Sequence, residues 1–358
     1  MTSTPPIINL TPPRLDEDCI AQRITCIRPK RAKALKLEGQ IVDGKLIMHN
    51  YGAGGIGWTL LFGLVDHSVR QFEELVASNP QFANRPIRII GAGCMGLYTA
   101  IGLHKKGYQV AITAKEIEDI TSYKAAGIVA PSKITTGKSA HEAALIERLA
   151  LSAYATYMAI ANGTHPYISA GARHIPLYAY PGNDDTDFTL THYVTAGLIS
   201  PPTTVMIDFG TGKRYQVAHY ETLFIDTVTL MNRLHDLCRT AGIVITKAHV
   251  THFNDLVEDV IFNCSGLGAT ALNSDAAMVP VQGHLIALKH QPAAPAHEYI
   301  IHARVQTVGR NGYPRTEYVY FVPKGEGMLG TSYITCQAGL DTNAHEFDRI
   351  LQRARNFF

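Results

Sequence analysis

The sequence predicts an α/β protein with a second part built mainly on an antiparallel sheet. An apolar strand, Ile87–Ile90, runs into the glycine-rich loop Gly91–Gly96 and then a helix, which is typical of a Rossmann-like, dinucleotide-binding unit. A second glycine-rich loop, Gly52–Gly57, also runs directly into a helix. Short β-rich segments follow between residues 175 and 333, and their spacing suits an antiparallel sheet better than further βαβ units.

Length and composition bound the class of protein. A chain of 358 residues, 46% apolar and 17% charged, is long enough for two globular domains. A net charge of +2 is no reason to expect nucleic acid as a partner, and a solvated strand or loop explains the cluster Lys30, Arg31, Lys33 and Lys36 better than a phosphate-tracking patch does. No apolar run approaches the length of about 18 residues needed to span a bilayer.

The N-terminal residues and the cysteines favour a cytoplasmic protein. Residues 1–15 are rich in Pro and Thr and lack the charged and apolar regions of a secretion signal. The six cysteines have no paired spacing, so we expect reduced thiols and not a disulfide framework or a zinc site. The sixteen histidines are scattered without ligand-like pairs, and we expect no metal.

The expected elements follow from periodicity and from turn residues. A helix follows the first glycine loop, because apolar residues between 60 and 75 recur at three- and four-residue steps. The polar, proline-bounded segment Asn79–Pro86 links it to the βαβ unit, in which Gly107 ends the helix Met95–Lys106 before the strand Gln109–Thr113. Other expected helices are Ala143–Ile160, Asp226–Thr240 and Asn343–Phe357; other expected strands are Ile24–Ile27, Lys45–His49, Ile175–Tyr180, Val205–Phe209, Tyr215–Tyr220, His284–Lys289, Tyr299–Val305, Glu317–Val322 and Gly327–Tyr333.

The loop Gly91–Gly96 has the context that a nucleotide site requires. Its first glycine permits a tight turn, its second lets the backbone approach a pyrophosphate, and its third lets helix and strand pack closely. The helix N-terminus, which includes Cys94 and Met95, favours negative charge. Lys115 and Glu116 compete for the ribose-binding place at the end of the second strand. A purely structural turn is the alternative interpretation.

Two other segments fit the same nucleotide. The stretch around Val250 precedes an apolar strand that ends in the small-residue turn Ser265-Gly266-Leu267-Gly268, where bare backbone can lie beside a ligand. A simple βα turn would explain that segment equally well. The residues Gly54, Gly55, Ile56, Gly57, Trp58 and Thr59 open a helix whose N-terminus can stabilise the negative charge on a reduced flavin, although a tight corner is the alternative.

Taken together, these pieces resemble the D-amino acid oxidase/glycine oxidase family of FAD enzymes. In that family the dinucleotide loop comes first, followed by a stretch similar to Thr121–Ile128 and then by a segment like Asn263–Ala269. An Arg-Pro motif and a loop similar to His49–Thr59 come late in the family, whereas here Arg28-Pro29 and His49–Thr59 come first. The resemblance therefore covers nearly the whole chain from Ile24 onward, in circularly permuted order, with Asn79–Pro86 joining the family's usual ends.

The resemblance implies an FAD-binding domain and a substrate-binding domain. It also implies that Ala126, Gly127 and Ile128 contact the cofactor. The expected division is a tail at 1–22, a discontinuous FAD-binding domain at 38–165 and 224–282, and a substrate-binding domain at 23–37, 166–223 and 283–358.

Residues carried over from the family describe the expected active site. Arg28 matches the arginine that binds the substrate carboxylate, and Tyr320 matches a tyrosine that hydrogen-bonds the same group. The family's second active-site tyrosine has no clean match, because Thr316 occupies that spacing with Tyr313 nearby. Cys26 lies where related sarcosine oxidases tether FAD covalently; a small buried residue is the other interpretation.

The reaction implied by the resemblance is oxidation of the C–N bond of a D-amino acid, glycine or an N-methyl amino acid. Hydride would pass to flavin N5, the imine would hydrolyse, and oxygen or another acceptor would reoxidise the flavin, oxygen giving hydrogen peroxide. The expected partners are this small substrate and the electron acceptor, without nucleic acid or membrane. Two alternatives remain: a flavin-binding protein with little oxidase activity, and a nicotinamide-dependent dehydrogenase, which would not explain the loop His49–Thr59.

Overall fold

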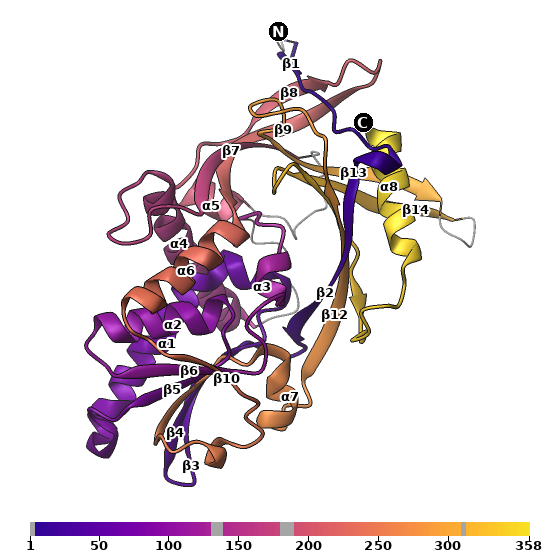
Figure 1. Cartoon of the computed structure of the whole chain (residues 1–358). Coiled ribbons are helices and arrows are strands. Elements are labelled where there is room, and N and C mark those ends of the chain that lie inside the picture. Colours follow the sequence, from indigo (N-terminus) through magenta and orange to yellow (C-terminus); the bar gives the residue numbers. More distant parts are fainter. Residues whose placement is uncertain (1–3, 130–138, 180–189, 309–312) are drawn as a thin grey trace.

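The structure, a computed structural model, describes residues 4–129, 139–179, 190–308 and 313–358. Within these residues the chain forms two sheets (Figure 1). The smaller has six strands in the order β10-β6-β5-β11-β4-β3. The larger has ten strands, of which nine follow the order β1-β8-β9-β7-β13-β14-β15-β12-β16 while β2 pairs with β12.

Five strands of the six-stranded sheet run parallel, and only β3 is antiparallel to its neighbour. Their apolar runs are buried on both faces, as a covered parallel sheet requires: Leu46 and Met48 face one core cluster and Ile47 faces another. The strands are β3 (Lys36–Val42), β4 (Lys45–Tyr51), β5 (Ile87–Ile90), β6 (Val110–Ala114), β10 (Ile245–Lys247) and β11 (Val260–Asn263).

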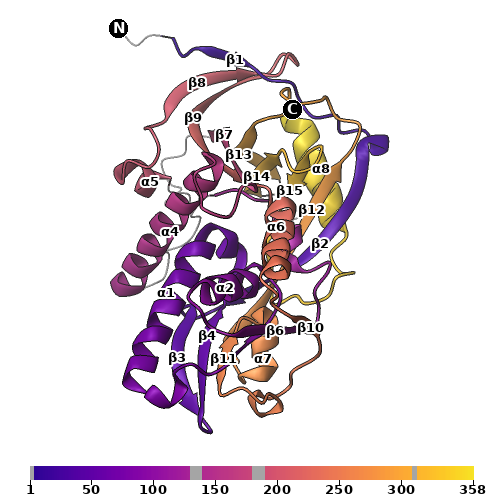
Figure 2. The same cartoon turned by 60° about the vertical axis from the view of Figure 1, so that its left-hand side comes forward.

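Helices cover the six-stranded sheet. α1 (Gly57–Ser78) packs on α2 (Cys94–Lys105) and runs beside α4 (Ala140–Ala161), and α6 (Thr227–Thr240) packs on α2 (Figure 2). The opposite face is covered by α7 (Ala269–Leu272), whose Leu272 packs with Ile47. No helix in the described ranges is both long enough and apolar enough to cross a membrane.

The ten-stranded sheet is mixed. The pairs β1–β8 and β7–β13 are parallel and the other pairs are antiparallel, so the expected antiparallel sheet is confirmed except at these two places. One face packs on α8 (His345–Phe357). Its strands are β1 (Ile7–Asn9), β2 (Ile20–Arg31), β7 (Ala172–Ala179), β8 (Thr203–Asp208), β9 (Arg214–Ile225), β12 (Met278–Leu288), β13 (Ile300–Val308), β14 (Pro314–Val322), β15 (Met328–Gly330) and β16 (Ile334–Thr335).

The expectation of a tail at residues 1–22 is wrong. Ile7–Asn9 pair with β8, and Leu15, Cys19 and Ile20 are buried. Tyr299 donates a hydrogen bond from its hydroxyl to the Thr11 carbonyl at 2.6 Å. Apolar side chains were too sparse there to predict order, and it is the edge of β8 that supplies the backbone partners.

Most expected elements are confirmed within a few residues. β5 coincides with the predicted strand, and the predicted helices correspond to α1, α2, α4, α6 and α8. β3 was not predicted, although Asp43-Gly44, both at positive φ, is a typical signal for a two-residue hairpin turn. The end of the predicted strand Ile175–Tyr180 lies outside the described residues.

The N-terminal residues supply strands to both sheets. β2 pairs with β12 from Ile20 to Arg31, and β4 pairs with β11 in the other sheet. Figure 1 shows these indigo strands beside orange strands that come more than 200 residues later. Segments distant in sequence therefore build the region where the two sheets meet.

The close contact between α1 and α4 at Gly63 predicts how alanine substitutions change the stability of the protein. A Cβ at Gly63 of α1 would overlap the Leu149 carbonyl of α4, whereas a Cβ at Gly102 of α2 would meet no atom within 4 Å. We expect G63A to lower the free energy of unfolding by about 2 kcal/mol through overpacking. G102A should raise it by about 0.5–1 kcal/mol, because alanine favours the helix. Denaturant unfolding measures both values, and equal stability of the two variants would contradict this packing.

Candidate active site

The candidate site begins at one edge of the six-stranded sheet, where its parallel strands end. The loop from Gly52 follows β4, the loop from Gly91 follows β5, and Lys115 follows β6. Val250 and Ser265 come shortly after β10 and β11. Because parallel strands present their carboxyl ends at the same edge, five segments that the sequence singled out separately lie along one edge, the usual place for a ligand in such sheets.

The loop Gly91–Gly96, which follows β5, leaves little or no room for a side chain at its three glycines. Gly91 has a φ of +110°, and a Cβ there would lie 2.5 Å from the Cys264 carbonyl oxygen. A Cβ at Gly96 would overlap the Gly91 carbonyl oxygen, so the start of α2 packs directly on the end of β5. Gly93, the residue before α2, is limited by Ser122, whose Oγ would lie 3.1 Å from its Cβ. The predicted reasons for the first and third glycines are confirmed.

The two glycine-rich loops lie next to each other. A Cβ at Gly57 would lie 3.8 Å from Met95 Cε, so the first turns of α1 and α2 are in contact distance. Ser122 connects them: its carbonyl accepts a hydrogen bond from Trp58 Nε1 at 3.0 Å, and its Oγ accepts one from the Cys94 amide at 3.2 Å. The two loops are therefore neighbours at one edge of the sheet.

Both helix N-termini are suited to anionic groups. The residues that precede them, Ile56 and Gly93, provide no side-chain cap, and neither helix has an acidic residue in its first turn. Gly54, Gly55 and Ile56 form a single 3₁₀ turn before α1, and Thr59 is buried in the first turn of that helix. Backbone N–H groups and helix dipoles at this edge are available to a phosphate or a reduced flavin.

The segment Ala126–Ile128 is held by the ten-stranded sheet. Gly127 has a φ of +91°, a Cβ there would overlap the Ile225 carbonyl, and its own carbonyl accepts from the Ile225 amide at 2.7 Å. Ile128 forms a β-bridge with Phe224. Contact with β9 alone therefore requires a glycine here, and a role of this segment in cofactor binding stays a prediction.

Sequence reasoning missed Lys324, which holds the backbone just before the segment Ala126–Ile128. Its buried Nζ donates to the carbonyls of Tyr123 and Ala125 at 2.5 and 2.6 Å and to Thr227 Oγ1 at 2.8 Å. Burial lowers the pKa of Lys324 to about 8. A lysine in a turn after a strand carries no sequence signal for such a role, since two of its acceptors are backbone carbonyls some 200 residues away.

The remaining predicted cofactor residues lie along the same edge. Lys115 and Glu116 are exposed, and Glu116 pairs with Lys247 at 3.6 Å. Val250 is half-buried against the apolar cluster beneath the sheet. Ser265 donates from its amide and Oγ to Asn263 Oδ1, and Gly266 has a φ of +58°.

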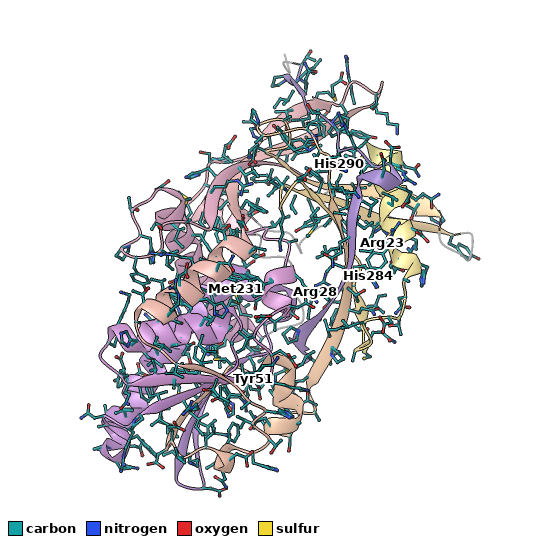
Figure 3. All side chains as sticks on the ribbon, viewed as in Figure 1. Arg23, Arg28, Tyr51, Met231, His284 and His290 are labelled. Carbon is teal, nitrogen blue, oxygen red and sulfur yellow. The ribbon has the colours of Figure 1, made fainter. Side chains whose placement is uncertain are left out.

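Arg28 lies on the face of β2 turned toward α3 (Thr121–Lys124), as Figure 3 shows. Its Nη1 donates to the Ser332 carbonyl at 3.1 Å and its Nη2 to Thr331 Oγ1 at 2.7 Å. A Cβ at Gly283, on the neighbouring β12, would overlap the guanidinium, which therefore lies flat on the sheet. Arg28 is half-buried and keeps donors for a further partner.

Tyr320 lies close to this arginine. It is on β14, where its ring would be 3.3 Å from a Cβ at Gly330 of β15, and β15 pairs in turn with β12 beside Gly283. Burial raises the pKa of Tyr320, and the charge of Arg28 opposes the rise. The structure thus brings the two predicted catalytic residues together from distant parts of the chain.

Tyr333 is a further aromatic residue that the sequence analysis did not single out. Its ring centroid lies 5.8 Å from Arg28 Cζ, and 53% of the residue is exposed. At the spacing of the family's second tyrosine, Thr316 Oγ1 accepts from Gln306, and Tyr313 is 70% exposed. Only the pairing of β15 with β12 and β14 carries Tyr333 to Arg28, so no local pattern could have predicted it.

Two neighbours of Arg28 complete the surroundings. Cys26, on the same face of β2, is a buried free thiol, as its interpretation as a small buried residue predicts, and covalent attachment to FAD stays the alternative. His284 of β12 lies on the opposite face toward α8, with Nδ1 2.6 Å from Ser332 Oγ and its ring against Phe347 (Figure 3). His284 thereby fixes the residue whose carbonyl holds Arg28.

His49 is a buried histidine near the end of β4, and its hydrogen bonds determine which ring nitrogen carries the proton. Asn263 Oδ1 accepts both hydrogen bonds from Ser265, so Asn263 Nδ2 is free to donate to His49 Nδ1 at 3.3 Å. His49 Nε2 then carries the proton and lies 2.9 Å from Gln40 Nε2. Because both of these nitrogens would be donors, the Gln40 amide must be turned so that its oxygen accepts the hydrogen bond. Burial, with a smaller contribution from Lys36, lowers the pKa of His49 to about 4.

Comparison with known proteins shows the family and the fold of the chain. A family model described as FAD dependent oxidoreductase matches residues 87–358. A D-amino-acid oxidase of Streptomyces coelicolor is 26% identical over 246 residues, which cover 68% of this chain and 68% of that protein. The crystal structure of glycine oxidase from Geobacillus kaustophilus matches with a TM-score of 0.54 at 18% identity, covering 75% of this chain and 77% of that one. Iminodiacetate oxidase from Chelativorans sp. matches with a TM-score of 0.50 at 14% identity, covering 75% and 78%.

The buried His49 predicts a pH dependence of stability. Between its ordinary pKa of 6.5 and the folded value of about 4, the unfolded chain binds a proton that the folded chain does not. Stability therefore falls as the pH is lowered through this window, by about 2–3 kcal/mol from this residue, and the loss is complete below the folded pKa. In H49Q this part of the slope should vanish, as denaturant unfolding at several pH values can measure. An unchanged slope in H49Q would show that other groups cause the acid destabilisation.

Proposed function

The chain belongs to the FAD dependent oxidoreductase family, and from this premise we propose that it oxidises the C–N bond of a small amino acid. The candidates are a D-amino acid, glycine or an N-methyl amino acid. The observation that carries the proposal is Arg28, a half-buried arginine that, among the residues the structure describes, is held by neutral acceptors and that lies beside the glycine loop before α1. A carboxylate is the ligand that such a planar cation binds best.

FAD fits the residues at the sheet edge. Three features support this: two helix N-termini without a side-chain cap from the preceding residue, glycines that leave bare backbone, and the Asn50 side-chain amide, which is buried without a hydrogen-bond partner among the described residues. We propose that FAD is held by Gly91, Gly93, Cys94, Met95, Gly96, Lys115 or Glu116, Ala126, Gly127, Ile128, Val250, Ser265, Gly266, Gly54, Gly55, Ile56, Gly57, Trp58 and Thr59. The cofactor of the family is FAD, so the nicotinamide alternative is dropped.

The protein's own contribution to the reaction is orientation. Arg28 binds the substrate carboxylate through the donors that Thr331 and Ser332 leave free, and Tyr320 adds a hydroxyl. With the carboxylate held, the neutral amine and the C–H bond next to it have a restricted set of positions, and this lowers the entropic cost of the reaction. The C–H step then needs no protein base. FAD, held at the sheet edge by the residues proposed above, would supply the redox chemistry for hydride removal and for electron transfer to oxygen, with hydrogen peroxide as the product. The imine then hydrolyses in water.

We also propose that the chain is a circular permutation of its family. The family match begins at residue 87, the first residue of β5, yet β4 lies between β11 and β3 in one sheet and β2 pairs with β12 from Ile20 to Arg31 in the other. The FAD-binding domain would comprise 38–165 and 224–282, and the substrate-binding domain 23–37, 166–223 and 283–358. The segment Asn79–Pro86 then joins the ends that the family has elsewhere.

Replacement of Arg28 tests the function. R28A should lower kcat/KM for the best substrate by about 100-fold, the loss expected when one charge-assisted hydrogen-bonding group is removed. FAD content should stay unchanged. The matched control is R23A on the same strand, because Arg23 is exposed and its ionic partner among the described residues is Glu17, at 3.0 Å. The measurement is anaerobic flavin reduction by D-amino acids, glycine, sarcosine and proline.

The same measurement decides the remaining alternative. If none of these compounds reduces the flavin of the wild-type protein, the chain is a flavin-binding protein with little oxidase activity. If R28A and R23A reduce equally fast, Arg28 is not the carboxylate-binding residue.

A further inference from the structure

Arg28 is one of two cations on the same face of β2. Lys30 follows two residues later, and alternate residues of a strand point to the same side. Arg31 points the other way, where its Nε pairs with Asp275 at 2.7 Å and Tyr51 donates to the same carboxylate at 2.9 Å. One face of β2 thus has its positive charge neutralised inside the protein.

On the other face of β2, which carries Arg28 and Lys30, the positive charge has no acidic partner among the described residues. Among the described residues, Arg28 has only two neutral acceptors, and Lys30 is exposed with neither a hydrogen bond nor an ion pair. Two cations of like charge on one face repel each other. An anionic group placed between or beside them would relieve that repulsion.

Both cations lie at the candidate site. The ring of Tyr333 lies 5.8 Å from Arg28 Cζ and 5.4 Å from Lys30 Nζ, measured to its centroid. Both also border the same glycine loop: a Cβ at Gly55 would lie 3.4 Å from Arg28 Cδ, and one at Gly54 would lie 3.2 Å from Lys30 Cβ. Lys30 is therefore not a remote surface lysine, because it shares an aromatic neighbour and a loop with Arg28.

We propose that the substrate is a dicarboxylic amino acid, with its α-carboxylate on Arg28 and its second carboxylate on Lys30. The inference rests on the proposed function and narrows it to acidic substrates. Tyr333 lies against both cations, so its ring borders the place that the second carboxylate would take. Neutral amino acids would use Arg28 alone.

Binding of inert probes to the FAD-loaded protein tests this without turnover. Glutarate and its monoamide, glutaramate, have nearly the same shape and differ by one negative charge. The dissociation constant of each follows from the absorbance change of the bound flavin. Wild-type protein should bind glutarate about fivefold more tightly, the upper range for a partly exposed ion pair. The preference should shrink as salt is added.

Three variants separate the contributions. K30M should remove the preference for glutarate and leave the affinity for glutaramate unchanged. K33M makes the same charge change at an exposed lysine nearby and should keep the preference. R28A should weaken both probes. With substrates, kcat/KM for D-glutamate over D-glutamine should change in the same direction as the probe preference in each variant.

The failures are distinguishable. Equal affinity of the wild-type protein for the two probes, with both still dependent on Arg28, would overturn the dicarboxylate inference alone. Loss of FAD affinity in K30M with the probe preference intact would assign Lys30 to the cofactor and also overturn it. If neither probe binds the wild-type protein, or if binding ignores Arg28, the proposed function itself fails.

Discussion

The antiparallel pairing of β2 with β12 is the constraint on which the rest of the candidate site depends. It extends from Ile20 to Arg31 and sets Arg28 beside Gly283, whose missing side chain leaves the surface on which the guanidinium lies. β12 also pairs with β15, and β15 with β14, so the same ladder brings Tyr320 toward Arg28. A shift of one residue in this register would turn Arg28 to the α8 face and expose Arg31 in its place.

Charge is distributed unequally over the ten-stranded sheet. On the face covered by α8, Glu317 pairs with Arg349 and Arg353, so buried charges there compensate one another. Within the described part of the chain, Arg28 instead has a threonine hydroxyl and a serine carbonyl as acceptors, which orient the guanidinium without neutralising it. A half-buried cation held in this way costs stability in the absence of an anion, and that cost is available as affinity when a carboxylate binds.

The two sheets are joined by contacts that also shape the sheet edge. Lys324, next to the end of β14, holds the backbone at Tyr123 and Ala125, and the backbone of Gly127 bonds to that of Ile225 in β9. Ser122, in the same short segment, contacts the starts of both α1 and α2. Residues 122–127 thus couple the position of the ten-stranded sheet to the two helix N-termini, which explains why this short stretch of sequence matters for the whole candidate site.

The sequence by itself determined the local parts: the apolar strand Ile87–Ile90, the periodic helices, and glycines whose φ or close contacts exclude side chains. It also indicated the family, because a short motif can be recognised from its own residues wherever it occurs along the chain. Only the tertiary structure decided that residues 7–9 form an edge strand, that Lys324 reaches across to Tyr123, and that Lys30 and Tyr333 accompany Arg28. The physical reason is that these depend on strand register and on side-chain direction between segments far apart in the chain, which periodicity and spacing do not encode.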